Sequence, residues 1–319
     1  MGIIEEYAKK RLLESMGLKR GESVLILTDE GKRKIGEKFY EGASQICNEV
    51  GLIIIKPRKY NREEPPPFVA EAMKKADIVI MVTSTSFTHT TARIEASKAG
   101  ARIASMPGIT EELIRRDYRV DYRKLNDYSK NLLEKLKGVR EVRVTTKLGT
   151  DITFSAQGRS FRGFHEGLFL SKGVYGNLPA GEIYIAPLEG TANGRIVVDA
   201  SMAGVGKLKG KMTIVVRDGY ATDITGGAQS KKFKKFLFGL SKGERNIAEF
   251  GIGTNPYMKI TGEVLGDEKV LGTCHFALGD NIGFGGKNRA RIHNDGVVRA
   301  PTIYADGRKI TENGKLVVN

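Results

Sequence analysis

One histidine and one aspartate stand two positions apart near the end of this 319-residue sequence, in the segment RIHNDG (291–296). The chain has only four histidines, and a glycine-rich stretch, GFGGKN (283–288), precedes this one. Side chains two apart on a strand lie on the same side, so His293 and Asp295 could reach one metal ion. The pair is therefore either part of a metal site or a turn with an ordinary polar histidine.

Three more side chains of the same kinds lie on segments that end plausible strands. Glu182 precedes IYIAP, and taken alone it is an acid at a strand edge. His275 taken alone is a core histidine with a satisfied hydrogen bond. Glu249 lies in an apolar run, where a carboxylate is costly to bury unless it is paired or binds a metal. Glu249 therefore points beyond a structural role by itself, and for His275 a ligand role is a strong second explanation.

Considered together, the five side chains predict a metal site formed by Glu182, Glu249, His275, His293 and Asp295. Imidazole and carboxylate ligands suit zinc, manganese, cobalt or iron. Five such ligands are enough for two ions that share a bridging carboxylate, and such a pair can generate hydroxide from water. The sequence has no compact HExxH motif that would indicate this chemistry alone.

The first half of the chain alternates apolar strands with helices. Continuous apolar runs predict buried strands, and a 3.6-residue periodicity predicts the helices. The expected strands are 23–28, 52–57, 76–84 and 101–108, and the expected helices include 3–16, 31–49, 91–100 and 125–138. Apolar strands that alternate with helices indicate a doubly wound parallel sheet, here a Rossmann-like α/β domain.

After about residue 140 the pattern changes to hairpins. Pairs of short strands joined by glycine-containing turns are expected over 142–156, 211–224 and 302–318. Asp-Gly and Asn-Gly pairs supply the turns that hairpins need. We therefore expect a Rossmann-like α/β domain over 1–139, followed by a β-rich α+β domain that binds metal over 140–319.

The first domain carries no clear phosphate-binding loop, because GxGxxG is missing after its first strand and GxxxxGK[ST] does not occur. The cluster TSTSFTHTT (83–91) follows the third strand, where such folds often bind ligands. Helix N-capping by Ser and Thr, with His89 at the surface, is the favoured explanation. His165 is expected to have a structural or surface role outside the ligand set.

The net charge of +15 could attract nucleic acid or anionic substrates. A surface rich in lysine and arginine explains it better, and nucleic acid is not an expected partner. The basic segment KKFKKFLFGL (231–240) fits an amphipathic helix with a solvated lysine face.

Membrane and export signals are missing from the sequence. No run of about 18 uncharged apolar residues occurs, so no membrane span is expected. The first 22 residues lack the apolar stretch of a signal peptide. Cys47 and Cys274 form no CxxC pattern. We expect a cytoplasmic protein.

The ligand segments resemble those of the M29 family of metalloaminopeptidases, the aminopeptidase T group. The similarity lies in FTHTTARIEASKAGARIASMPGIT (87–110), NLPAGEIYIAP (177–187), TCHFALG (273–279) and the HxD of IHNDG. The resemblance implies a dinuclear site with two divalent ions (zinc, cobalt or manganese). Its implied ligands are Glu182, Glu249, His275, His293 and Asp295. It also implies a peptide or small-molecule substrate and a homodimer formed through the second domain.

Two features depart from that family. Its peptidases are usually longer, and the segments on either side of His275 are short here. The family also has a tyrosine seven residues after its first histidine, and this chain has Ile282. The change removes a hydroxyl that could bind metal or stabilise an oxyanion.

The resemblance further implies an acid shortly before that histidine, and this acid or a metal-bound carboxylate would act as the general base. Asp267 and Glu268 are the nearest candidates, and we predict Glu268.

Three functions compete. The main prediction is a metal-dependent aminopeptidase, a hydrolase in which two ions activate water. The alternative is a mononuclear non-haem Fe(II) dioxygenase, because the family has relatives that open dihydroxypyridine rings. His275, His293 and Asp295 would then form a triad of two histidines and one carboxylate. Glu182 and Glu249, which one iron would not require, argue against it. The third function is that of a degenerate family member that acts as a binding protein.

Overall fold

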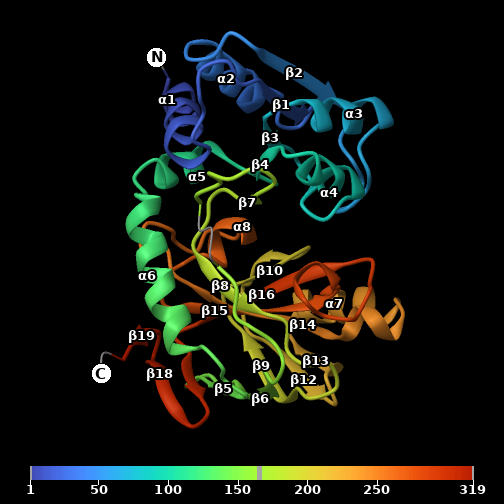
Figure 1. Cartoon of the computed structure of the whole chain (residues 1–319). Coiled ribbons are helices and arrows are strands. Elements are labelled where there is room, and N and C mark those ends of the chain that lie inside the picture. Colours follow the sequence, from blue (N-terminus) through green and yellow to red (C-terminus); the bar gives the residue numbers. More distant parts are fainter. Residues whose placement is uncertain (1, 164–166, 318–319) are drawn as a thin grey trace. The chain divides into compact units, whose positions relative to one another are not determined.

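A computed structural model of the chain describes residues 2–163 and 167–317 (Figure 1). His165 lies outside the described residues. The chain forms two compact units. Unit 1 comprises residues 1–126 and 165–180, and unit 2 comprises residues 127–164 and 181–319.

Unit 1 is built on a five-stranded sheet in the order β2-β1-β3-β4-β7. All neighbouring strands in it run parallel. The strands are β1 (Val24–Asp29), β2 (Val50–Ile55), β3 (Ile78–Val82), β4 (Arg102–Ser105) and β7 (Tyr175–Asn177). Every residue of β1, β3 and β4 is buried, as expected for apolar strands covered on both faces.

Helices precede, connect or follow these strands. They are α1 (Ile3–Lys10) with a π-helical continuation (Arg11–Ser15), α2 (Arg33–Ser44), α3 (Pro67–Lys75), α4 (Thr91–Lys98), α5 (Glu111–Asp117) and α6 (Tyr122–Lys135). The Thr90 side chain accepts a hydrogen bond from the backbone N–H of Arg93 and so caps α4. The N-capping explanation of the Ser/Thr cluster is confirmed at this residue, and the neighbouring His89 is half-buried.

Unit 2 contains two antiparallel sheets. The six-stranded sheet has the order β11-β10-β16-β15-β14-β8. Its strands are β8 (Glu182–Ile185), β10 (Ser201–Met202), β11 (Gly206–Lys207), β14 (Ile247–Gly253), β15 (Thr273–Gly279) and β16 (His293–Arg299). The eight-stranded sheet has the order β13-β12-β9-β6-β5-β17-β18-β19. Its strands are β5 (Glu141–Thr145), β6 (Asp151–Ser155), β9 (Asn193–Val198), β12 (Met212–Arg217), β13 (Tyr220–Gly226), β17 (Thr302–Ala305), β18 (Arg308–Glu312) and β19 (Lys315–Leu316).

The core of unit 2 lies between these two sheets. Phe154 on β6 packs against Phe250 on β14, with ring centroids 5.3 Å apart, and against Phe276 on β15 at 6.5 Å. Buried apolar residues of both sheets continue this cluster. The six-stranded sheet therefore has one face in the core and the other available for polar side chains.

The expected hairpin turns are confirmed. Asp218 and Gly219, between β12 and β13, both have positive φ, at 47° and 80°. A two-residue hairpin turn of type I′ needs positive φ at both central positions, which is why Asp-Gly occurs there.

The mixed α/β architecture with a β-rich second part agrees with the expectation, but the division of the chain differs. The single boundary at residue 139 falls inside unit 2. Two features explain the difference. The boundary after Asn126 lies within α6, and the short β7 returns to the sheet of unit 1. Three residues with a central glycine give no periodic signal that would predict such a strand.

The described part of unit 2 also contains the α-helices α7 (Ala228–Phe238) and α8 (Val264–Asp267). Phe233 and Leu237 of α7 are buried, whereas Phe236 is 48% exposed. The predicted amphipathic helix is confirmed. Among the described residues, no helix combines the length and apolar character needed to span a membrane.

Candidate metal centre

Four neighbouring strands of the six-stranded sheet carry the five predicted ligands. Glu182 lies on β8, Glu249 on β14, His275 on β15, and His293 with Asp295 on β16. These strands are adjacent in the order β8-β14-β15-β16. Residues separated by up to 113 positions in the sequence thus meet because the strands that carry them pair side by side.

Alternation along the strands puts these side chains on the face that is turned away from the core. On β14, Phe250 lies in the core, so its neighbour Glu249 points to the opposite face. On β15, Cys274 and Phe276 lie in the core and flank His275 in the same way. The candidate metal centre therefore lies on the face of the sheet that is opposite the hydrophobic core, and its residues are largely buried.

The Glu249 carboxylate lies between the two imidazoles. Its Oε1 is 3.3 Å from His275 Nε2, and its Oε2 is 3.3 Å from His293 Nε2. Asp295 Oδ1 lies 3.6 Å from the same His293 nitrogen. The expectation that His293 and Asp295 share one side of a strand is confirmed.

A backbone contact fixes the orientation of His293. Its Nδ1 lies 2.8 Å from the carbonyl oxygen of Asp280, which can only accept a hydrogen bond. Nδ1 therefore donates, and Nε2 is the nitrogen that faces Glu249 and Asp295. A hydrogen bond of this kind from the other ring nitrogen is the usual support of a metal-binding histidine.

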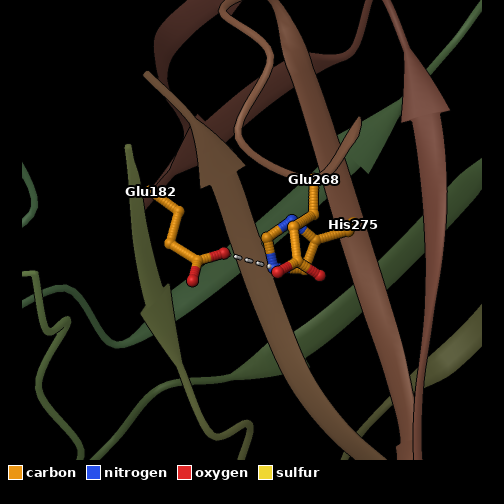
Figure 2. Close-up of side chains that lie close together, drawn as sticks. All are labelled: Glu182, Glu268 and His275. Atoms are coloured by element: carbon orange, nitrogen blue, oxygen red, sulfur yellow. Dashed lines mark ion pairs between the residues drawn. The ribbon is translucent and has the colours of Figure 1, made fainter. Parts of the chain in front are cut away.

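His275 reaches the carboxylates across a glycine. Gly251 is its direct neighbour on β14, and a Cβ at position 251 would lie 2.1 Å from His275 Nε2. The imidazole is fully buried, and its Nε2 is 3.2 Å from Glu182 Oε2 on β8, beyond β14 (Figure 2). Glycine at position 251 thus allows a side chain of β15 to contact an acid two strands away.

A buried lysine that the sequence analysis missed lies among these acids. Lys269 is 1% exposed, and its ammonium contacts Glu182 and lies 2.5 Å from Glu268 Oε1. Figure 2 shows the carboxyl groups of Glu182 and Glu268 beside the ring of His275. Glu268, the predicted general base, therefore belongs to the cluster.

The segment that follows α8 is held by its backbone. The Lys269 carbonyl accepts a hydrogen bond of 2.8 Å from the backbone N–H of Asn255. Asp267 accepts hydrogen bonds from the backbone N–H groups of Thr261 and Gly262, at 2.7 and 2.9 Å. Asp267, the second candidate for a general base, thus has a structural role in this loop.

The pKa values of Glu268 and His275 are both raised. Burial raises the pKa of Glu268 to about 8, because the nearby Lys269 charge only partly offsets the loss of water. For His275, burial lowers the pKa, but the hydrogen bond to Glu249 and the surrounding carboxylates outweigh this effect and raise it to about 9. In the metal-free protein near neutral pH, Glu268 can therefore hold a proton, and His275 is an imidazolium.

Glu249, His293 and Asp295 form a charged network. Burial opposes ionisation of all three, but the ion pairs among them prevail. The pKa of His293 is raised well above its usual value, and the pKa values of Glu249 and Asp295 are lowered. A metal ion that binds here must displace protons from both histidines.

The donor set fits a divalent metal ion. Ligand atoms of Glu249, His293 and Asp295 lie within 4.8 Å of one another, and so do those of Glu182, Glu268 and His275. Within residues 2–163 and 167–317 these are the groups of three or more potential ligands that lie so close together. The five predicted ligands are all present in them, and their roles as ligands remain a prediction.

Other residues that the sequence analysis considered lie elsewhere. His89 belongs to unit 1. Ile282, which stands where the aminopeptidases have a tyrosine, is 39% exposed in a short 3-10 helix (Ile282–Phe284). Its apolar side chain brings no hydroxyl to the cluster.

Solved structures that share this fold include the following two. The first, the structure of 2,5-dihydroxypyridine dioxygenase from Pseudomonas putida KT2440, is 19% identical. Its TM-score is 0.83, and the alignment covers 100% of this chain and 99% of that chain. The second, wild-type AmpT from Thermus thermophilus, is 15% identical with a TM-score of 0.72 and 99% coverage of both chains. No curated protein matches the sequence.

A protein family described as "NicX: 2,5-dihydroxypyridine 5,6-dioxygenase" matches residues 6–318. The main prediction of an aminopeptidase, and with it the assignment to the hydrolases, is wrong, because this match and the dioxygenase structure point to an oxidoreductase. Both resemblances rest on acids and histidines of types that suit hydrolytic and redox metals alike, so the ligand segments alone could not separate them. The chain belongs to the NicX (2,5-dihydroxypyridine 5,6-dioxygenase) family.

Proposed function

We propose that this protein is a ring-cleaving dioxygenase. In this proposal one ferrous ion, held by His275, His293 and Asp295, serves the reaction of a dihydroxylated pyridine with dioxygen. The membership of the family supports the reaction class. The triad supports the metal, because two histidines and one carboxylate with open positions are typical of non-haem Fe(II) oxygenases.

One observation carries the proposal. Nε2 atoms of His275 and His293 converge on the two oxygens of Glu249, each at 3.3 Å, with Asp295 Oδ1 3.6 Å from His293 Nε2. Two imidazoles from the adjacent strands β15 and β16 thus face one carboxylate on β14, with Asp295 beside His293. Bound iron would supply the one-electron redox chemistry that a reaction with dioxygen requires.

The protein groups around the triad have separate tasks. The Asp280 carbonyl holds the tautomer of His293 that leaves Nε2 available. Glu268, which lies in the same cluster, would in its ionised form take a hydroxyl proton of the ring at a carboxylate oxygen and return it later. Removal of that proton makes the ring more electron-rich and so more reactive toward dioxygen. The role of Glu268 as a base is thus proposed for this reaction.

The test is oxygen uptake by the iron-loaded protein. Protein reconstituted anaerobically with Fe(II) is mixed with 2,5-dihydroxypyridine in air-saturated buffer, and dissolved oxygen and the ultraviolet absorbance of the ring are followed together. We expect one oxygen molecule consumed for each ring lost, and no consumption by zinc-loaded protein.

Matched variants make the result specific. His293→Ala and Asp295→Asn should lose both iron and oxygen uptake. Lys309→Met, at the exposed Lys309–Glu312 ion pair on β18, should retain both. Iron-loaded protein that consumes no oxygen with dihydroxypyridines, or an iron-free Asp295→Asn variant that remains active, contradicts the proposal.

A further inference from the structure

A side-chain cation already lies within one of the two groups of potential ligands. The Lys269 ammonium is buried and contacts one oxygen of Glu182 and one of Glu268. Those two acids and His275 are the group that a second metal ion would use. A buried ammonium requires such partners, because an unpaired charge away from water is very costly.

The same carboxylates cannot serve the lysine and a divalent ion at once. An ion between Glu182 and Glu268 would lie close to a positive charge in a site with little water to screen it. The negative charge of Glu182 and Glu268 is therefore largely neutralised by the Lys269 ammonium. The third member of that group of potential ligands is His275. Its Nε2 lies 3.3 Å from Glu249, so it can face the group formed by Glu249, His293 and Asp295.

We propose that the Lys269 ammonium takes the place of a second metal ion, so that the site binds one ion, with His275 joining His293 and Asp295. The presence of Glu182, which one iron would not require, is then explained by Lys269. This acid serves the lysine, whereas Glu249 lies within contact of both histidines.

The backbone holds the lysine in this position. The backbone N–H of Asn255, just beyond β14, donates a hydrogen bond of 2.8 Å to the Lys269 carbonyl. The backbone N–H of Leu271 donates one of 3.0 Å to the Asn255 carbonyl. Gly253 allows this close approach, because a Cβ there would lie 2.1 Å from the carbonyl oxygen of Val270. The cation is thus fixed to the sheet that carries the ligands.

The inference rests on the proposed function only in placing a metal ion at the triad, and its test uses neither oxygen nor a pyridine. Metal-free full-length protein is saturated with cobalt(II), free metal is removed by gel filtration, and bound cobalt per chain is measured by elemental analysis. We expect one ion in the wild-type protein and two in Lys269→Met, which frees both acids. The exposed control Lys309→Met should bind one.

A double variant shows where the second ion binds. Glu268→Gln with Lys269→Met removes one acid together with the lysine, so the count should return to one. Two ions in the wild-type protein, or one ion in a folded Lys269→Met variant, overturn the inference.

Loss of a buried charge partner can prevent folding, so Lys269→Met is also refolded with excess cobalt(II). Recovery of a folded chain with two ions supports the inference. Failure to fold with and without cobalt overturns it, because the acids then do not accept an ion in place of the ammonium. Wild-type protein with one iron and no oxygen uptake refutes the proposed function alone, and protein that binds no metal refutes both.

Discussion

The imidazole of His275 lies across the backbone of Gly251, and a Cβ at position 251 would stand 2.1 Å from His275 Nε2. The two residues are direct neighbours in the register of β14 and β15. His275 is fully buried, so its ring has little freedom to move aside. The glycine therefore sets the position of one predicted ligand without touching the metal.

Replacement of Gly251 by alanine should weaken metal binding. The new methyl group forces the His275 ring out of its place, and loss of ligand support of this kind typically costs about 10- to 100-fold in metal affinity. Cobalt(II) affinity measured by titration calorimetry checks this. Gly210→Ala is the matched control, because a Cβ at position 210 meets nothing within 4 Å. Equal affinities for the two variants would contradict the proposed position of His275.

Metal removal should destabilise the protein. A ligand that binds only the folded chain stabilises it by about 2.7 kcal/mol when its concentration is 100 times its dissociation constant. We therefore expect a chelator to lower the unfolding temperature of the wild-type protein, as measured by calorimetry. Asp295→Asn, which removes one predicted ligand, should show no difference between the two conditions. A chelator effect of equal size in both proteins would exclude Asp295 as a ligand.

Much of the fold could be predicted from the sequence because its signals are local. Apolar runs gave β1, β3 and β4, and Asp218-Gly219 marked the turn between β12 and β13. The strand β7 and the unit boundary within α6 could not be predicted, because both depend on which distant strands pair. Such pairing is decided by tertiary packing and leaves little trace in a short segment.

The site could be predicted in part for the same reason. Acids and histidines in apolar segments are unusual enough to draw attention, and His293 with Asp295 could be placed on one face by the strand period. Lys269 could not be found, because a lysine after two acids in GDEK reads as an exposed residue. Its burial depends on Glu182, which is 87 positions away in the sequence.

Removal of the Asp267 carboxylate should loosen the loop that carries Lys269. Asp267 is fully buried and accepts hydrogen bonds from the backbone of Thr261 and Gly262. Buried N–H groups without a partner cost about 1–3 kcal/mol each, so Asp267→Ala should lower the free energy of unfolding by roughly 2–4 kcal/mol. Urea unfolding measures the loss. Asp127→Ala, at an exposed position on α6, should cost less, and equal losses would refute this role of Asp267.

Alkaline pH should destabilise unit 1 through two buried phenols. Tyr7 and Tyr122 donate to the two oxygens of Asp117 at 2.6 and 2.5 Å, and Arg11 Nε lies 3.1 Å from the same carboxylate. Burial, and next the Asp117 charge, raise the pKa of both tyrosines well above 10. In the unfolded chain a tyrosine titrates near pH 10, so above this pH the folded chain holds more protons.

The free energy of unfolding should therefore be unaffected by these phenols below pH 10 and should fall above it. Each contributes a slope of up to about 1.4 kcal/mol per pH unit until its folded-state pKa is reached. Tyr7→Phe should remove one such contribution, which urea unfolding at a series of pH values from 9 to 11 would measure as a shallower decline. Tyr60→Phe, at a side chain that is 72% exposed, controls for loss of a hydroxyl. If Tyr7→Phe declines as steeply as the wild-type protein, the Tyr7 phenol does not hold its proton in the folded chain as argued.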